Sequence, residues 1–222
     1  MVSIAIDGPA GAGKSTIAKN VSKQLSYIYV DTGALYRSIA LNAINNNTDI
    51  SNSDEIENLL KNTNVEIKFI DGEQRVFLNQ NDISDKIRTT EVSMIASKVS
   101  AVPAVREFLL ELQRSIAREN NVIMDGRDIG TVVLPDAQVK IFLTASAECR
   151  AKRRYNDYVT MGVYETYDKI LADIVKRDYD DSHREIAPLK PADDAVTIDT
   201  SNDTLEESVE RIIKLVKEKI NQ

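Results

Sequence analysis

The chain has 222 residues, of which 42% are apolar and 28% charged, and this balance excludes a wholly disordered protein. Its single cysteine and single histidine exclude an internal disulfide and a His/Cys zinc cluster, and they favour a reducing compartment. The formal net charge of −7 argues against broad nucleic-acid binding, so an anion site needs locally concentrated cations.

The sequence predicts neither a targeting segment nor a membrane span. Its first apolar run is interrupted by Asp7 and lacks the basic region of a signal peptide. No apolar stretch approaches the roughly 20 residues that cross a bilayer. We therefore expect a cytoplasmic protein without a membrane partner. A monomer is the expected state, because no heptad seam or exposed apolar stripe is present.

The first predicted elements are a strand over residues 2–7, a helix over 14–25 and a second strand over 27–31. The helix has apolar residues at a spacing of four, whereas both strand segments are short apolar runs. Three further short runs, each bounded by turn or polar residues, predict strands over 121–124, 139–144 and 195–199.

The last predicted helix begins at a sequence that resembles a capping box, formed by Thr204 and Glu207. Its predicted apolar face comprises Leu205, Val209, Ile212, Val216 and Ile220. Strands that alternate with helices imply an α/β fold with a mainly parallel sheet covered on both faces. One region departs from this alternation, because Asp71-Gly72 between two alternating apolar runs predicts a β-hairpin in an insertion over about 60–85.

The strongest motif is a glycine-rich turn between the first strand and the first helix. Residues 8–15 fit G-x-x-x-x-G-K-[ST], and the strand-turn-helix context indicates a P-loop that binds a nucleoside triphosphate. Glycines let backbone N–H groups approach phosphate oxygens, and the helix N-terminus adds partial positive charge. We expect Lys14 to reach the phosphates from the solvent side of the fold and Ser15 to ligate Mg²⁺. The predicted triphosphate-binding residues are Gly8, Pro9, Ala10, Gly11, Ala12, Gly13, Lys14, Ser15 and Thr16.

Other features narrow the class of P-loop protein. A base-reading [NT]-K-x-D sequence is absent, which disfavours a GTPase, and so is the Ser-Gly-Gly signature of transporter-type ATPases. Kinases of small molecules remain.

A second candidate segment is Asp-Thr-Gly-Ala-Leu-Tyr-Arg at residues 31–37, directly after the second strand. Ligands of doubly wound sheets bind at the carboxyl ends of strands. The segment presents the Thr32 hydroxyl, the Tyr36 ring and the Arg37 guanidinium there. The alternative is an ordinary strand-to-helix turn with a surface arginine.

A third candidate segment follows the strand at 121–124, where Asp125 and Asp128 bracket Arg127. Two carboxylates can orient an arginine towards a phosphate, and Asp125 can also hold a metal-bound water. The alternative is a tight turn with a local ion pair.

A fourth segment, residues 150–154, holds four cations in a predicted helix, with Arg150, Arg153 and Arg154 on one face. Such a cluster needs an anion or nearby carboxylates, and the alternative is a solvated basic face. Residues 177–184 alternate acid and base and, taken alone, predict an exposed loop, with His183 as a loop residue rather than a catalyst. Cys149 is expected to be a small buried apolar residue of the same helix as the cations.

The chain resembles the bacterial cytidylate (CMP) kinase family in six ordered blocks: GPAGAGKST, DTGALYR, IRTTEV, SKVSAVPAVRE, DGRDIGTVVLPDA and REIAPL. The resemblance implies one P-loop nucleoside monophosphate kinase domain over residues 1–222. It implies a five-stranded, mainly parallel sheet flanked by helices, the insertion at about 60–85 and a lid at about 150–175. It also implies transfer of the γ-phosphoryl group of ATP to CMP or dCMP with Mg²⁺, while the lid and the insertion close to exclude water.

The resemblance implies roles for the matching residues. It assigns the CMP phosphate to Arg37, Arg127 and Arg184, the cytosine base to Ser97, Arg106 and Asp128, and the sugar hydroxyls to Arg177 and Asp181. Thr32, which stands where many relatives carry Ser, and Tyr36 complete the expected CMP site. The expected catalytic residues are Lys14, Arg127, Arg184 and the lid cations Arg153 and Arg154.

Three alternative functions are weighed against a CMP kinase. One is a kinase of the same class that uses another nucleoside monophosphate. Another is an ATP-binding regulatory module without turnover, against which the retained Lys14, Ser15 and phosphate-site arginines argue. The third is a nucleic-acid-binding ATPase, which the acidic net charge disfavours.

Overall fold

The computed structural model describes residues 1–220, which divide into two compact units. The P-loop unit comprises Val2–Tyr27 and the chain from Asn121 onward. The middle unit comprises Met1 and Ile28–Asn120. The limits predicted for the insertion and the lid stay predictions.

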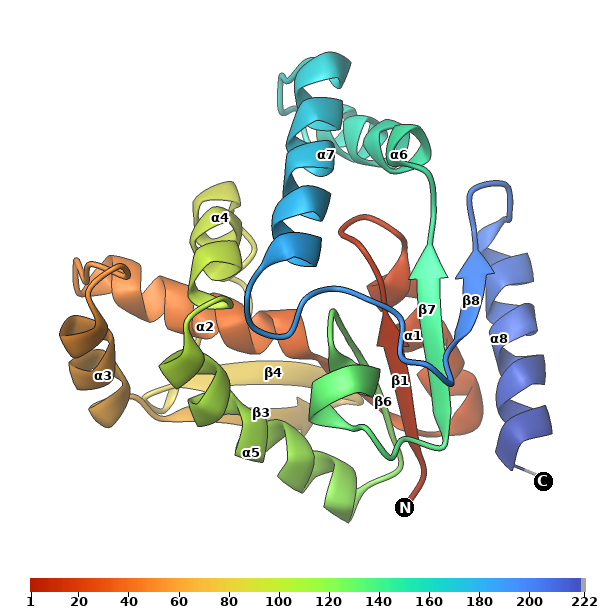
Figure 1. Ribbon diagram of the computed structural model, residues 1–222, viewed down its shortest axis with the longest axis horizontal. Helices are drawn as coiled ribbons and strands as arrows, with labels where there is room; N and C mark the ends of the chain where they lie inside the picture. The colour runs from red at the N-terminus through yellow and green to blue at the C-terminus, as the bar shows by residue number, and fades with distance from the viewer. Residues whose placement is uncertain (221–222) are drawn as a thin grey trace. The chain divides into compact units, whose positions relative to one another are not determined.

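The P-loop unit contains four strands, four α-helices and one π-helical turn among the described residues (Figure 1). In chain order they are β1 (Ser3–Asp7), α1 (Lys14–Leu25), β6 (Val122–Gly126), the π-helix (Ile129–Val133), β7 (Val139–Thr144), α6 (Ala147–Thr160), α7 (Tyr167–His183), β8 (Val196–Asp199) and α8 (Leu205–Ile220).

Strand β1 pairs in parallel with β6 on one side and with β7 on the other, and β7 pairs in parallel with β8. In this register Ile4 stands opposite both Ile123 and Val139. Residues 4–7 are all buried, and such a continuous buried run is typical of a parallel strand covered on both faces. These strands confirm the sequence predictions to within two residues.

Helix α1 packs against β1 and β6, and α8 packs against α1 and β7. The predicted capping box of α8 is confirmed: the Thr204 N–H donates to Glu207 Oε2 at 2.8 Å, and the Glu207 N–H donates to Thr204 Oγ1 at 3.2 Å. Val209, Ile212 and Val216 are buried as predicted. Leu205 is an exception, because it lies exposed in the first turn of the helix.

The middle unit contains β2 (Ile28–Asp31), α2 (Thr32–Asn45), α3 (Ser53–Lys61), β3 (Val65–Ile70), β4 (Glu73–Leu78), β5 (Asn81–Asp82), α4 (Thr90–Val99) and α5 (Pro103–Glu119). The predicted hairpin is confirmed as β3 and β4, which pair antiparallel around Asp71 and Gly72. Both turn residues have positive φ, +53° and +78°, as a two-residue hairpin turn requires. Helices α2 and α5 contribute to the core of this unit through Leu35, Ile39 and Leu109, which are fully buried.

The larger sheet has five strands in the order β2-β6-β1-β7-β8, and the smaller one has three in the order β3-β4-β5. The predicted α/β fold with a five-stranded parallel sheet is confirmed. Within residues 1–220, no helix has the length and apolar character that crossing a membrane requires.

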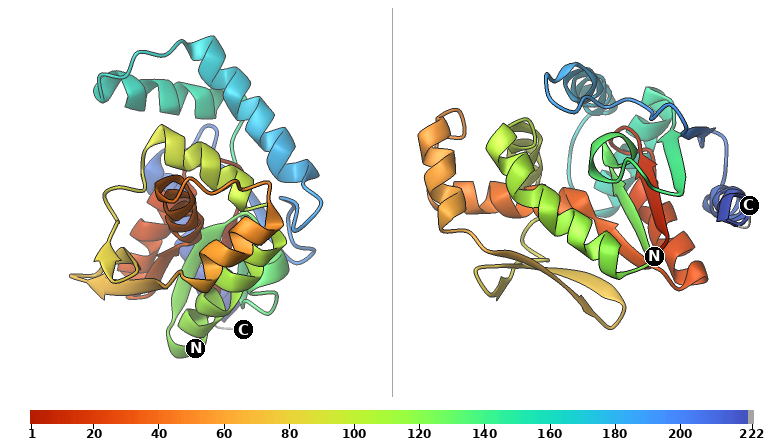
Figure 2. Two further views of the ribbon diagram at one scale, coloured as in Figure 1. Left: turned by 90° about the vertical axis from the view of Figure 1, so that its left-hand side faces the viewer. Right: turned by 60° about the horizontal axis from the view of Figure 1, so that its bottom comes forward.

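The expectation of an exposed loop over 177–184 is wrong. Most of this segment belongs to α7, which packs against α6 and is joined to it by a short loop (Figure 2). Its buried residues are only Ile170, Ile174 and Asp181, so the buried stripe is too narrow to show as apolar periodicity. His183 is therefore the last helical residue, and its ring stacks on Tyr179 with 3.9 Å between centroids.

The expectation for Cys149 is also corrected. It lies in the first turn of α6 and is half-buried rather than buried. Its Sγ lies 3.4 Å from the carbonyl oxygen of Ser201, at the surface of the P-loop unit.

Candidate active site

The P-loop is a turn whose backbone only glycine accommodates. Gly8, Gly11 and Gly13 have φ values of +147°, +77° and +86°. At Gly8 a side chain is also excluded by space, because an added Cβ would lie 1.9 Å from the carbonyl oxygen of Leu143. The turn leads into α1, whose first N–H groups receive no side-chain cap. Uncapped N–H groups at a helix start are the donors that bind a phosphate.

Lys14 is buried, so the expectation that its charge lies on the solvent side is wrong. The residue is 6% exposed, and its Nζ donates to the carbonyl oxygen of Pro9 at 2.8 Å. Burial, and then the nearby charge of Arg127, lower the pKa of Lys14 to about 7, although Asp125 and Asp7 act in the opposite direction. An ammonium group in this position gains stabilisation from any anion that enters the loop.

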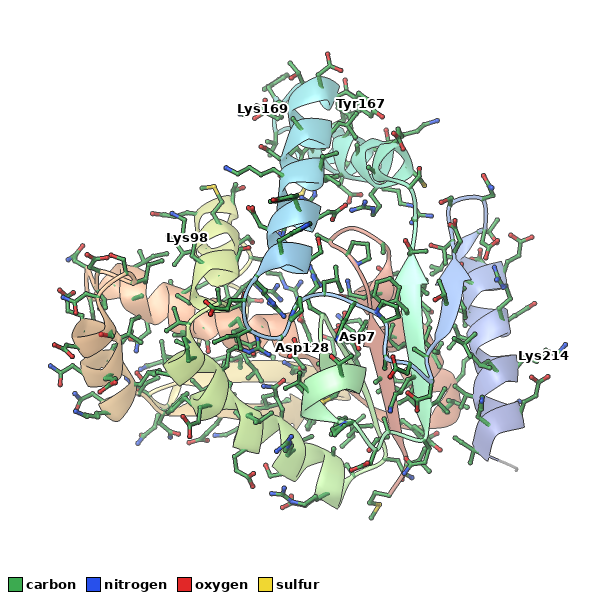
Figure 3. All side chains as sticks on the ribbon, in the orientation of Figure 1. Asp7, Lys98, Asp128, Tyr167, Lys169 and Lys214 are labelled. Atoms are coloured by element: carbon green, nitrogen blue, oxygen red, sulfur yellow. The ribbon has the colours of Figure 1, made fainter. Side chains whose placement is uncertain are left out.

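Asp7, at the end of β1, was not predicted as a site residue. Its two carboxylate oxygens accept the N–H groups of Ile129 and Gly130, each at 2.7 Å. It lies close to Asp128 (Figure 3), and burial raises its pKa to about 6 despite the two hydrogen bonds. Asp7 therefore fixes the start of the π-helix directly after Asp128. An acidic residue that ends a buried strand just before a P-loop was the available sequence signal.

Ser15 and Asp125 meet at the N-terminus of α1. The Ser15 hydroxyl donates to Asp125 Oδ2 at 2.7 Å, although the two residues are 110 positions apart. Among residues 1–220, no group of three or more His, Cys, Asp or Glu side chains forms a metal cage. One hydroxyl beside one carboxylate nevertheless suits Mg²⁺ in nucleotide sites, where protein ligands are few and phosphates and waters supply the rest.

Arg127 is held by a carboxylate that the sequence did not single out for it. Its Nε donates to Asp181 Oδ2 on α7 at 2.8 Å, and its Nη1 donates to the Gly126 carbonyl at 3.3 Å. Burial alone would raise the pKa of Asp181, but the charges of Arg127, Arg177 and Arg184 hold it below its usual value. Arg127 thus keeps one terminal nitrogen, Nη2, clear of these two contacts.

Arg184 follows the end of α7 and contacts Asp128. Its Nη2 donates to Asp128 Oδ1 at 3.2 Å, and both side chains are less than 10% exposed. The structure thereby brings together Arg127, Asp128, Asp181 and Arg184, all predicted as acceptor-site residues from distant parts of the chain. Arg177 belongs to the same group, because its charge acts on both Lys14 and Asp181.

The cations of α6 differ in their surroundings. Arg150 is buried and pairs with Asp178 of α7, so the expected carboxylate partner exists for this residue. Arg153 donates from Nη2 to the Thr200 carbonyl at 2.7 Å, and its Nη1 lies 3.9 Å from where a Cβ on Gly13 would stand. Arg154 is half-buried on the same helix. Arg150 and Arg153 therefore both lie beside the P-loop.

The remaining predicted residues belong to the middle unit. Asp31 caps α2 by accepting the Ala34 N–H at 3.0 Å, and its other oxygen accepts from Arg37 Nη2 at 2.7 Å. The Arg37 Nε is buried without a hydrogen-bond partner, so this guanidinium has unused donor capacity.

Two base-reading candidates also lie in the middle unit. Arg106 is 8% exposed, donates to the Ser100 carbonyl at 3.1 Å and stands over the Tyr36 ring at 5.8 Å. Ser97 is half-buried on α4, and Thr32 is buried at the start of α2.

Comparison with known proteins gives full-length similarity. A sequence model of the cytidylate kinase family matches residues 4–218. A cytidylate kinase of Lactobacillus johnsonii is 51% identical over 219 residues, which cover 99% of this chain and 95% of that protein. One from Caldicellulosiruptor saccharolyticus is 50% identical over 214 residues, covering 96% and 95%. A crystal structure of an uncharacterized protein from Eubacterium ventriosum shares the fold with a TM-score of 0.53 at 13% identity, covering 98% of this chain and 99% of that one.

Proposed function

This chain belongs to the cytidylate kinase family and transfers the γ-phosphoryl group of ATP to CMP or dCMP; we propose that the cluster around its P-loop carries this transfer. The supporting observation is the set of three contacts within the P-loop unit: Ser15 with Asp125, Arg127 with Asp181, and Arg184 with Asp128. These contacts support the proposal because they join residues that we assign to the triphosphate and to the acceptor. Phosphoryl transfer needs positioning and charge stabilisation rather than a side-chain nucleophile.

Each cation in the cluster has a role in the proposal. Lys14 stabilises charge on the transferred phosphoryl group, and Arg127 and Arg184 hold the phosphate of CMP, which is itself the nucleophile. Arg153 and Arg154 neutralise the phosphates from α6, and Arg37 of the middle unit stays a predicted ligand of the CMP phosphate. Arginine is suited to these tasks because its planar guanidinium can donate two parallel hydrogen bonds to a pair of phosphate oxygens.

Mg²⁺ is proposed to be held by the Ser15 hydroxyl, with Asp125 acting through water. When bound with ATP, the ion neutralises charge on the phosphates. In its absence, Asp125 already orients the Ser15 hydroxyl through their 2.7 Å hydrogen bond. The protein is proposed to act in the cytoplasm as a monomer without nucleic acid, which its acidic composition and lone cysteine support.

A panel of acceptors tests the proposed function. CMP, dCMP, UMP, AMP, GMP and dTMP are each incubated with ATP, Mg²⁺ and the protein, and ADP release is followed in a coupled assay. We expect CMP and dCMP to be the preferred acceptors by kcat/KM. Preference for another monophosphate, or ATP hydrolysis without any acceptor, contradicts the proposal.

Replacing Asp128 by Asn is expected to narrow the preference for CMP over UMP by roughly tenfold or more. Cytosine offers an amino group to the Asp128 carboxylate, whereas uracil places a carbonyl oxygen there, so two hydrogen-bond acceptors face each other. A carboxamide can rotate to donate to that oxygen. The measurement is kcat/KM for CMP and for UMP.

The matched control is Asp136→Asn, which removes an exposed carboxylate near the π-helix and should leave the preference unchanged. An unchanged CMP/UMP ratio in Asp128→Asn would show that the base is recognised elsewhere.

Binding of ATP at pH 8 is expected to take up protons through Lys14. The pKa of Lys14 is about 7 without ligand, so most of its side chains are neutral at pH 8. The triphosphate raises this pKa, so bound protein gains a proton and affinity falls as the pH rises above 7. Calorimetry in buffers of different ionisation enthalpy measures the proton count, and Lys14→Met is the control. Equal proton uptake by both proteins contradicts this assignment.

A further inference from the structure

Arg150 is a buried arginine whose contacts lie behind the P-loop. Arg150 is only 4% exposed. The Nε donates to the Ala145 carbonyl at the end of β7 at 2.8 Å, and Nη1 donates to the Ala10 carbonyl of the P-loop at 3.1 Å. The guanidinium also pairs with both carboxylate oxygens of Asp178, with 3.0 Å between Nη1 and Oδ1. One side chain therefore joins β7, the P-loop and α7.

The contact with the Ala10 carbonyl affects the direction in which the next backbone N–H of the P-loop, that of Gly11, points. A peptide group is planar and trans, so the Ala10 carbonyl and the Gly11 N–H point in opposite directions. By holding the carbonyl on its own side, Arg150 turns the Gly11 N–H to the other side of the loop. The stem of Arg150 also lies beside Gly11, because a Cβ on Gly11 would stand 3.4 Å from the Arg150 Cβ.

The contact with Asp178 links Arg150 to α7, the helix that carries or precedes residues assigned to the acceptor site. Asp181 lies one turn further along α7 and accepts from Arg127 at 2.8 Å. Arg184 directly follows the helix and contacts Asp128. A continuous helix moves as one body over this distance, so a shift of Asp178 displaces the partners of Arg127 and Asp128 as well.

We propose that Arg150 is a positioning residue that couples binding of the phosphoryl donor to binding of the acceptor. This inference rests on the proposed function and deepens it. Entry of a triphosphate fixes the Ala10–Gly11 peptide, and through Arg150 and Asp178 it fixes α7 in the position that holds Arg127 and Arg184 for the acceptor phosphate. Each substrate then binds more tightly when the other is present.

The test measures the coupling directly. The dissociation constant of CMP is determined by calorimetry with and without a saturating non-hydrolysable ATP analogue and Mg²⁺, and that of the analogue with and without CMP. In the unmodified protein we expect each ligand to tighten the other by the same factor, about tenfold, because linkage is reciprocal.

Arg150→Lys keeps the positive charge but loses the fork that reaches Ala10 and Asp178 together. Asp178→Asn keeps the shape of its partner but removes the charge. Both variants are expected to bring the coupling factor close to one while each ligand still binds alone. Lys152→Met, which removes an exposed cation of α6, should keep the full factor.

The outcomes separate the inference from the proposed function. Thermal melts establish that each variant is folded, and Asp178→Asn provides the test if Arg150→Lys does not fold. The inference is overturned if a folded variant keeps the coupling factor of the unmodified protein. It is also overturned if the unmodified protein shows no coupling. Failure of the unmodified protein to phosphorylate CMP overturns the proposed function instead.

Discussion

The Lys14→Met variant is expected to lose phosphoryl transfer by a factor of about 10²–10³ in kcat, the loss typical of removing one transition-state contact. Lys14 is the buried cation of the P-loop, and its ammonium is oriented by the Pro9 carbonyl at 2.8 Å. Methionine has a similar length and fills the space of the lysine stem without the charge. Initial rates at saturating ATP and CMP measure the loss.

This variant should fold. Burial lowers the pKa of Lys14, which means that the charged form costs free energy in the folded state. Removing the charge removes this cost, so the melting temperature at pH 7 should not fall far below that of the unmodified protein. Lys23→Met is the control, because Lys23 is exposed in the last turn of the same helix. Near-normal turnover in folded Lys14→Met would exclude Lys14 from the reaction.

The Arg127→Lys variant is expected to lose kcat/KM for CMP by about 10²-fold or more, with little change in the affinity for ATP. Lysine keeps the charge, but it has a single ammonium nitrogen. It therefore cannot bind Asp181 and a phosphate through separate nitrogens, as the planar guanidinium of arginine can. Asp181 is 5% exposed, so losing its partner also leaves a buried carboxylate poorly satisfied. Steady-state kinetics with CMP and equilibrium binding of ATP separate the two effects.

Arg211→Lys is the matched control, since Arg211 is an exposed arginine of α8 that pairs with Asp203. It should change neither parameter. If Arg127→Lys instead lost its affinity for ATP and kept its KM for CMP, Arg127 would serve the donor rather than the acceptor.

Several elements with a strong local pattern were predicted from the sequence, although helices α3 and α5 were not. Helix α1 and strand β7 were placed to the residue, and the hairpin was found from Asp71-Gly72, because the turn chemistry and the apolar alternation agree. The π-helix at Ile129–Val133 was missed, since five residues carry no periodic signal and Asp7 fixes its start from β1. Strand β5 was missed because it has only two residues.

The candidate site was predicted as a set of residues but not as a set of contacts. The motifs and the family resemblance supplied Arg127, Asp128, Asp181 and Arg184, yet the Arg127–Asp181 pair spans 54 positions and follows from the fold alone. The burial of Lys14 was likewise not evident from its motif, because a P-loop sequence does not specify what packs over its lysine. Asp7 was passed over because a strand residue without a ligand motif attracts no functional interpretation.

The position of β1 between β6 and β7 has a consequence for how the chain folds during synthesis. The strand ends at Asp7, but β7, which completes its pairing, begins only at Val139. At about 5–20 residues per second, a ribosome takes on the order of 10 s to produce that interval. Throughout it the apolar β1 has at least one unpaired edge, a feature that promotes association with other nascent chains. The phosphate-binding turn is therefore encoded among the earliest residues, but the strand that completes the pairing of β1 is made more than 130 residues later.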